Sequence, residues 1–165
     1  MMKMALLMIA AATLGPSGTA APARQVAESI SYETGGCFGP CPVYSVTVHA
    51  DGRGLFVGHR YTAVTGRHSF RTTPAEYRAF AAFLEPLHPS SGSVHYDGPP
   101  LCDEMATDQS SAVVKWRMRD GREQSFSFYY GCDMDRKWDP KQALAERLRR
   151  APDRLPIAAF IARRR

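Results

Sequence analysis

Four cysteines offer the most chemistry in this 165-residue chain, and two of them stand close together in the stretch Cys37-Phe38-Gly39-Pro40-Cys41. Thiol–disulfide exchange needs a thiolate of low pKa, often presented by a C-x-x-C frame. Here three residues separate the cysteines, one of them is proline, and the residues that follow alternate like a strand rather than a helix. The pattern therefore favours a structural disulfide over a redox site.

The other two cysteines, Cys102 and Cys132, make the number even, which fits an oxidising compartment. Four thiolates could also hold zinc, but no second closely spaced cysteine pair and no nearby histidine completes a finger-like ligand set. Four cysteines allow three pairings, and the sequence alone does not choose among them. We favour Cys102–Cys132 together with Cys37–Cys41, because Cys102 is expected only a few residues beyond the base of the hairpin that ends before Cys132.

Acidic side chains gather in the stretch 88–110 and just after the second expected hairpin; they are Asp97, Asp103, Glu104, Asp108, Asp133 and Asp135. A Cys102–Cys132 bridge would bring these acids together, and hard oxygen ligands of this kind suit calcium. The same acids of the 88–110 loop could serve a small hydrolase or a metal-dependent enzyme. They lack EF-hand spacing, and loop acids are ordinarily solvated. We therefore assign no metal ligand, no cofactor and no catalytic residue.

Other catalytic signatures are missing from the sequence. The histidines form no H-x-x-x-H or H-E-x-x-H pattern, and they are His49, His59, His68, His88 and His95. The sequence also contains no G-x-S-x-G elbow and no phosphate-binding glycine loop. The composition and motifs therefore favour a protein that is not an enzyme.

Positive charge is concentrated near the C-terminus. The formal net charge is +5, and residues 136–165 hold ten basic and three acidic side chains. The leading functional hypothesis is a module that binds an undefined partner or an anionic envelope surface, such as lipid headgroups or cell-wall polymers. The candidate contacts with such a surface are Arg147, Arg150, Arg154, Arg163, Arg164 and Arg165. The competing interpretation is a solvated helix face, since basic residues also favour helix C-termini.

The first residues resemble a targeting segment. Lys3 precedes an apolar run over residues 4–14, and Ala21-Pro22-Ala23 offers small residues at the two positions that a signal peptidase inspects. We expect a signal peptide over residues 1–23, since the run is too short for a membrane-spanning helix of about 20 residues. The chain should then be a bacterial periplasmic or secreted protein with no transmembrane segment, for which nucleic acid is not an expected partner.

After residue 23 the sequence predicts one domain over residues 24–151 and a basic tail over residues 152–165. Strands are expected over residues 26–32, 43–49 and 55–61, with a further strand pair across Thr65-Gly66. The stretch Thr73-Pro74-Ala75-Glu76 has the composition of a capped helix start, and apolar residues follow it at helical spacing to residue 87.

A second hairpin is expected from residues 112–119 and 122–130 around Asp120-Gly121. Counting back from a two-residue turn places Gln109 opposite Cys132. Residues 88–110 look irregular, and Asp139-Pro140 begins a C-terminal helix. The predicted fold class is α+β, with an antiparallel meander and hairpin forming a sheet of five or six strands, one helix packed on a face and a C-terminal helix beside it.

The cysteine stretch also carries a family resemblance. The pattern C-x-G-x-C-P-x-Y-x-V over residues 37–46, followed by D-G at 51–52 and F-x-G at 56–58, resembles the family of domain of unknown function 6438, which comprises uncharacterised bacterial secreted proteins. The resemblance continues through Gly66, the helix after Thr73, Asp108 and the second hairpin, and covers roughly residues 27–150. It implies the fold and a secreted setting, and it brings no activity.

Overall fold

The computed structural model describes residues 26–134 and 140–161. Seven strands form one sheet: β1 (Ser29–Thr34), β2 (Val43–His49), β3 (Arg53–Arg60), β4 (Gly66–Arg71), β5 (Ser93–Tyr96), β6 (Ser111–Arg117) and β7 (Glu123–Tyr129). The helical elements are α1 (Pro74–Leu84), η1 (Glu85–Leu87), α2 (Pro140–Arg150), η2 (Ala151–Arg154) and α3 (Ala158–Ile161), where η marks a 3-10 helix. The protein is therefore α+β, as expected.

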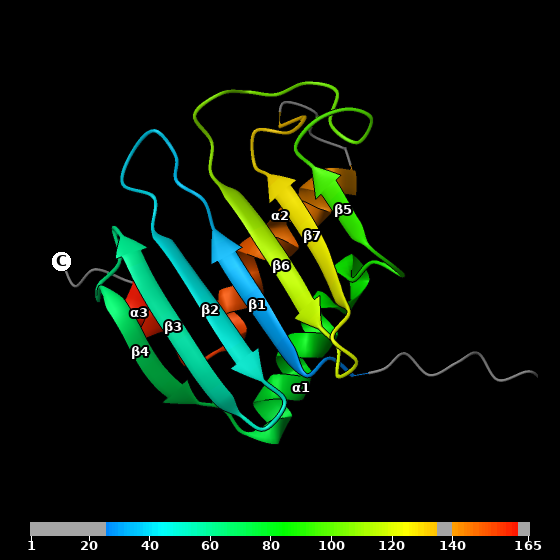
Figure 1. The fold of residues 1–165 in the computed structure, drawn as a ribbon. Coiled ribbons are helices and arrows are strands. Elements are labelled where there is room, and N and C mark those ends of the chain that lie inside the picture. Colours follow the sequence, from blue (N-terminus) through cyan, green and yellow to red (C-terminus); the bar gives the residue numbers. More distant parts are fainter. Residues whose placement is uncertain (1–25, 135–139, 162–165) are drawn as a thin grey trace, which may run out of the picture.

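The sheet has the strand order β4-β3-β2-β1-β6-β7-β5. Central β1 pairs antiparallel with β2 on one side and with β6 on the other. The predicted number of strands is too low, and the sheet is mixed because β5 runs parallel to β7. The missed strand has only four residues and lies inside the stretch that looked irregular. The chain reaches it after α1, which lies behind the sheet and joins one edge to the other (Figure 1).

Both Asp-Gly turns close loops of three residues. His49 and Arg53 flank the first loop, and Met118 and Arg122 flank the second, where the Met118 amide donates to the Arg122 carbonyl at 2.9 Å. The second loop sets Ser111 opposite Tyr129. The assumption of a two-residue turn shifts the expected hairpin register by one residue, and the expected pairing of Gln109 with Cys132 is wrong, since Cys132 forms an isolated bridge with Met105.

Helix α1 begins as its sequence predicts. The Thr73 hydroxyl accepts from the Glu76 amide at 3.2 Å, and the Glu76 carboxylate accepts from the Thr73 amide at 2.6 Å. This reciprocal pair satisfies two backbone donors that a helix start would otherwise leave unpaired. Its buried face presents Tyr77, Phe80 and Leu84 to the sheet.

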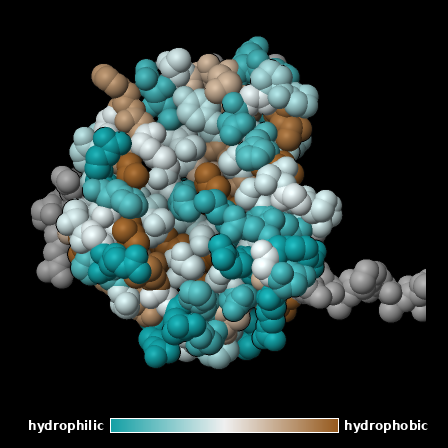
Figure 2. All heavy atoms as spheres, in the orientation of Figure 1, coloured by the Kyte–Doolittle hydropathy of each residue, from teal (hydrophilic) through white to brown (hydrophobic). Residues whose placement is uncertain are grey.

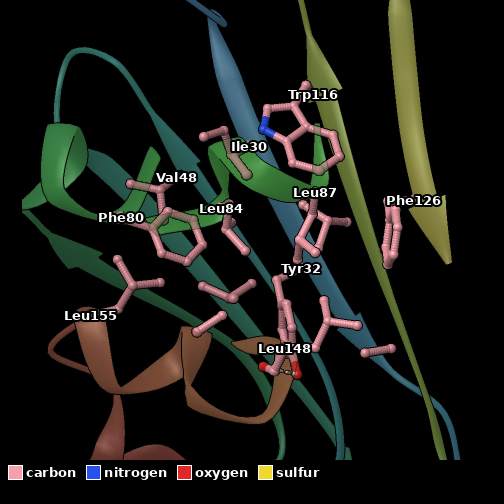
Figure 3. Close-up of a cluster of buried hydrophobic side chains, with 14 of the residues drawn as sticks. Ile30, Tyr32, Val48, Phe80, Leu84, Leu87, Trp116, Phe126, Leu148 and Leu155 are labelled. Carbon is pink, nitrogen blue, oxygen red and sulfur yellow. Dashed lines mark hydrogen bonds between the residues drawn. The ribbon is translucent and has the colours of Figure 1, made fainter. Parts of the chain in front are cut away.

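All helices cover one face of the sheet (Figure 1). The hydrophobic core fills the space between the sheet and these helices. Side chains from the sheet and from both longer helices meet there, such as Tyr32 of β1, Phe80 of α1 and Leu148 of α2 (Figure 3). Among the described residues, no helix lies over the opposite sheet face. Figure 2 shows that hydrophilic side chains dominate this face, with small apolar patches between them.

The packed region continues beyond the expected domain end at residue 151. Leu155 and Ile157 are buried, and the Phe160 ring lies 5.4 Å from the Phe56 ring of β3. The Phe160 carbonyl also accepts from the Ala63 amide at 3.0 Å. Residues 152–161 thus belong to the folded unit. Within the described part of the chain, no helix is long and apolar enough to cross a membrane.

Candidate functional site

The cysteine motif forms a short closed loop between β1 and β2. A disulfide joins Cys37 to Cys41, with the two Cα atoms 5.8 Å apart. Just outside the bridge, the Thr34 hydroxyl donates to the Pro42 carbonyl at 2.8 Å and accepts from the Tyr44 amide at 3.0 Å. One side chain of β1 thereby fixes the entry of the chain into β2.

A cavity of about 220 Å³ lies beside this loop. It sits where β1 and β7 end and where β2 and β6 begin, and the last turn of α2 closes one side. Its lining residues are Tyr32, Thr34, Gly35, Cys41, Pro42, Tyr44, Ser110, Ser111, Tyr130, Arg149 and Ile161. Arg149 is the one charged residue in this set, which contains no carboxylate.

Tyr44, the tyrosine of the motif, lines the cavity. Only 5% of it is exposed, and its ring lies 5.2 Å from Phe56 in a stacked arrangement. No group in the described residues hydrogen-bonds its hydroxyl, and every fully enclosed side-chain nitrogen or oxygen there has a partner. The Tyr44 hydroxyl therefore reaches the open space of the cavity. Burial, with smaller effects from Tyr130 and Asp153, raises the pKa of Tyr44 and keeps the phenol neutral.

Two further tyrosines and an arginine complete the wall. The Tyr32 hydroxyl donates to the Leu148 carbonyl at 3.1 Å, and burial raises its pKa well above the usual range. Burial also raises the pKa of Tyr130. The Arg149 guanidinium lies 4.5 Å from the centre of the Tyr130 ring, a cation–π distance, and it also lies 4.0 Å from the carboxylate of exposed Glu146.

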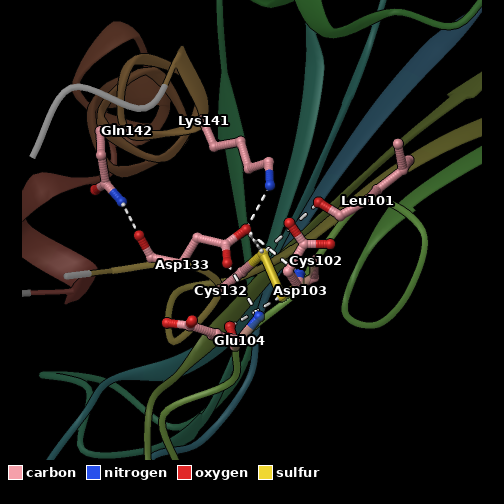
Figure 4. Close-up of polar contacts among 8 residues, drawn as sticks. All are labelled: Leu101, Cys102, Asp103, Glu104, Cys132, Asp133, Lys141 and Gln142. Carbon is pink, nitrogen blue, oxygen red and sulfur yellow. Dashed lines mark hydrogen bonds and ion pairs between the residues drawn. A yellow bond between two sulfur atoms is a disulfide. The ribbon is translucent and has the colours of Figure 1, made fainter. Parts of the chain in front are cut away.

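The second disulfide joins Cys102 to Cys132, so the structure contains both favoured pairs. Buried Asp133 follows it and forms an ion pair with Lys141 of α2 (Figure 4). The Asp133 carboxylate also accepts from the Glu104 amide at 3.0 Å. The hydrogen bond from Lys141 lowers the Asp133 pKa most, and the amides of Glu104 and Asp103 and the charge of Lys141 lower it further. Together they hold this pKa below its usual value. These contacts of Asp133 with Glu104 and Lys141, called the buried node below, connect the long loop, the end of β7 and the start of α2.

The expected convergence of the acids is met only in part, because Asp103 and Glu104 lie beside Asp133 at the bridge, whereas Asp97 and Asp108 lie elsewhere. Asp97 accepts from the Ser127 hydroxyl at 3.3 Å at the β5–β7 edge, whereas the Asp108 carbonyl accepts from the Phe38 amide at 3.0 Å beside the cysteine motif. In the described residues, the one group with metal-ligand spacing is Cys102, Cys132 and Asp133. Its two sulfur atoms are already bonded to each other. Asp135 lies outside the described residues.

The predicted arginine contacts divide into three sets. Arg147 and Arg154 both lie over the Phe83 ring of α1, at 5.0 Å and 4.5 Å from its centre. Arg147 also donates to the Phe83 carbonyl at 2.8 Å, and it is partly buried. Arg150 is exposed at the end of α2. The remaining predicted contacts, Arg163, Arg164 and Arg165, lie outside the described residues.

The cavity was not predicted from the sequence, although two tyrosines in the sequence could have indicated it. Tyr32 and Tyr44 lie on the core-facing side of neighbouring strands, where alternation predicts only packing. A phenol at the end of such a face carries a hydroxyl that must find a partner or open space. The position of Arg149 over the Tyr130 ring depends on how α2 crosses the ends of the strands, and local sequence patterns do not specify that crossing.

Comparison with known proteins bears out the resemblance of the cysteine stretch. No curated protein matches the chain. A family model described as a domain of unknown function (DUF6438) matches residues 28–151, which is most of the chain and nearly the whole described fold. The protein therefore belongs to the family of domain of unknown function DUF6438.

Proposed function

We propose that this protein is a non-enzymatic binding module of the periplasm or the extracellular space, and that it attaches to an anionic surface of the cell envelope. Two disulfides in a small domain support the setting, because such bridges persist in oxidising compartments. The alternative, an enzyme built on the loop acids, has weaker support, since Asp133 is already engaged by Lys141 and Asp97 lies apart at the edge of the sheet.

The observation that carries the proposal is the pair of arginines on one aromatic ring. The guanidinium groups of Arg147 and Arg154 both lie within 5.0 Å of the centre of the Phe83 ring. Their separation is therefore within about one Debye length, ~10 Å at 0.1 M salt, so the two charges repel each other. An anionic group placed against both would relieve this repulsion, and exposed Arg150 adds a third charge at the same helix end.

Cosedimentation with vesicles tests this proposal. Vesicles of phosphatidylglycerol and phosphatidylcholine should bind the protein at low salt, and vesicles of phosphatidylcholine alone should not. Removing two surface charges with Arg150→Gln and Arg154→Gln should weaken binding by about 2 kcal/mol, or roughly 30-fold, because each basic side chain near an anionic membrane contributes about 1 kcal/mol. Added salt should weaken binding as well.

The matched control removes two other exposed arginines, with Arg67→Gln on β4 and Arg119→Gln at the second hairpin. This variant has the same net charge as the test variant and should keep most of the binding. Equal loss in both variants would show only nonspecific attraction of a basic protein. Binding to neutral vesicles at the same level would contradict the proposal.

A further inference from the structure

We propose that the cavity beside the cysteine motif binds a monocarboxylate group with a short apolar stem, either as a free small acid or as the end group of a larger molecule. The site is separate from the arginine pair on Phe83, and the inference does not depend on surface binding. Four observations support it, and each concerns groups that line the cavity.

The first observation is the unsatisfied donor. Tyr44 as a whole is 95% buried, but its hydroxyl reaches the open space of the cavity and makes no hydrogen bond among the residues described. A phenol hydroxyl at the edge of a packed core ordinarily finds a hydrogen-bond partner, and this one is free to pair with a group that enters the cavity. A ligand oxygen in the cavity would supply that partner.

The second observation is that the other available polar groups can also donate. Ser110 and Ser111 line the same cavity, and no side-chain hydrogen bond ties up either hydroxyl within the described residues. Thr34 is different, because its hydroxyl is already used by Pro42 and Tyr44. The free groups therefore suit a ligand that accepts several hydrogen bonds.

The third observation is the charge. Arg149 brings one positive charge to the cavity, and its stacking on Tyr130 leaves the N–H groups at the edge of the guanidinium plane able to pair with a planar oxyanion. Its contact with Glu146 at 4.0 Å is exposed on both sides and hence weak. Arg149 is the one cation among the lining residues, and Asp153 acts on Tyr44 from outside the lining, so the site matches a monoanion better than a dianion such as phosphate.

The fourth observation is the shape and lining. A volume of about 220 Å³ is smaller than a pocket for a drug-sized ligand, which occupies about 300–1,000 Å³. Pro42, Ile161 and the Cys41 end of the disulfide give the cavity apolar walls. Such a space takes an end group with a few carbon atoms, with the carboxylate against Arg149 and Tyr44.

Titration of the oxidised, ¹⁵N-labelled protein with sodium butyrate, followed by NMR, tests this inference. Saturable shifts should appear at the amides of Ser110 and Ser111 and at the Arg149 side chain. Butyramide, which has the same size without the charge, should bind at least about tenfold more weakly, because hydrogen bonds to charged groups contribute most to such pairing. Inorganic phosphate should also bind more weakly than butyrate. Phosphate binding as tight as butyrate would overturn the carboxylate assignment, and equal binding of butyramide would overturn the need for charge.

Two variants make the test specific. Tyr44→Phe removes only the unpaired hydroxyl and keeps the ring on Phe56, so the folded spectrum should persist while butyrate affinity falls about tenfold. Arg149→Gln should abolish saturation. The control is Tyr129→Phe, whose hydroxyl donates to the Ala106 carbonyl outside the cavity, and it should bind butyrate like the wild type. Unchanged affinity in Tyr44→Phe, shifts confined to other regions, or no saturable shift at all would each overturn the inference.

Discussion

The Tyr32 hydroxyl of β1 donates a hydrogen bond to the Leu148 carbonyl of α2, across 116 positions of sequence and 3.1 Å of space. Leu148 needs this donor because the residue four positions later is Pro152, which has no backbone N–H to continue the helical ladder. The centre of the sheet thereby supplies the partner that the helix end lacks. The Tyr44 hydroxyl, on the neighbouring strand, makes no hydrogen bond with any described residue, which makes the two tyrosines a natural comparison.

Tyr32→Phe should lower the free energy of unfolding by about 1–3 kcal/mol, because it leaves the Leu148 carbonyl buried and unpaired. Tyr44→Phe should change it by less than about 0.5 kcal/mol, since that hydroxyl gives up no hydrogen bond within the described residues. Urea unfolding followed by far-UV circular dichroism measures both values. Equal losses in the two variants would contradict the different roles assigned to the two hydroxyls.

The two disulfides should contribute unequally to stability. In the chain-entropy relation, the loop closed by Cys102–Cys132, with a sequence separation of 30, is worth about 3.7 kcal/mol, and the loop closed by Cys37–Cys41, with a separation of 4, about 2 kcal/mol. Paired alanine variants of each bridge, compared by urea unfolding, should show the larger loss for the longer loop. A thiol assay of the denatured wild type should find no free thiol, and any other count would contradict the pairing.

Asp133 should make stability depend on acid pH. Because Lys141 and the loop amides hold its folded pKa below the ordinary value of 3.8, the folded state binds fewer protons than the unfolded state as the pH falls. Its contribution is therefore present above about pH 4 and is lost as the pH falls through the folded pKa. Asp133→Asn should lower the urea midpoint at pH 7, and the difference from wild type should shrink below pH 4.

Asp120→Asn is the control for this experiment. Asp120 also has a lowered pKa, caused by hydrogen bonds from Arg122, but it lies exposed in a hairpin turn. Exposed ion pairs contribute little, so this variant should change the pH 7 midpoint much less. A larger effect at Asp120 than at Asp133 would argue against the buried node as a stabilising element.

Local chemistry made much of the fold predictable. The helix start at Thr73 depends on contacts within four residues, and its capping box forms as its sequence predicts. Both hairpin turns were located correctly, but the second was expected to have two residues and has three, because Arg119, the residue before the aspartate, joins the turn. Asp51 and Asp120 each accept from the amide and the guanidinium of the arginine two positions later, which stabilises three-residue loops.

Long-range geometry set the limit of prediction. Strand β5 has only four residues, and it pairs in parallel with β7, from which β6 separates it in the sequence, so no local turn indicates the pairing. The cavity beside the cysteine motif depends on Arg149, which arrives there only because α2 crosses the ends of β1 and β7. Both cysteine pairs were predicted correctly. One bridge closes the short loop between β1 and β2, and the other lies beside the base of the β6–β7 hairpin.

The strand order has a consequence for how the protein matures. The sheet consists of two sequence-local halves, β4-β3-β2-β1 and β6-β7-β5, that meet only where β1 pairs with β6. Cys37–Cys41 lies within the first half and Cys102–Cys132 within the second, so neither bridge links the two halves. Each half can acquire its own native bridge before the halves associate, which separates the oxidation of the chain from the slow step of long-range strand pairing.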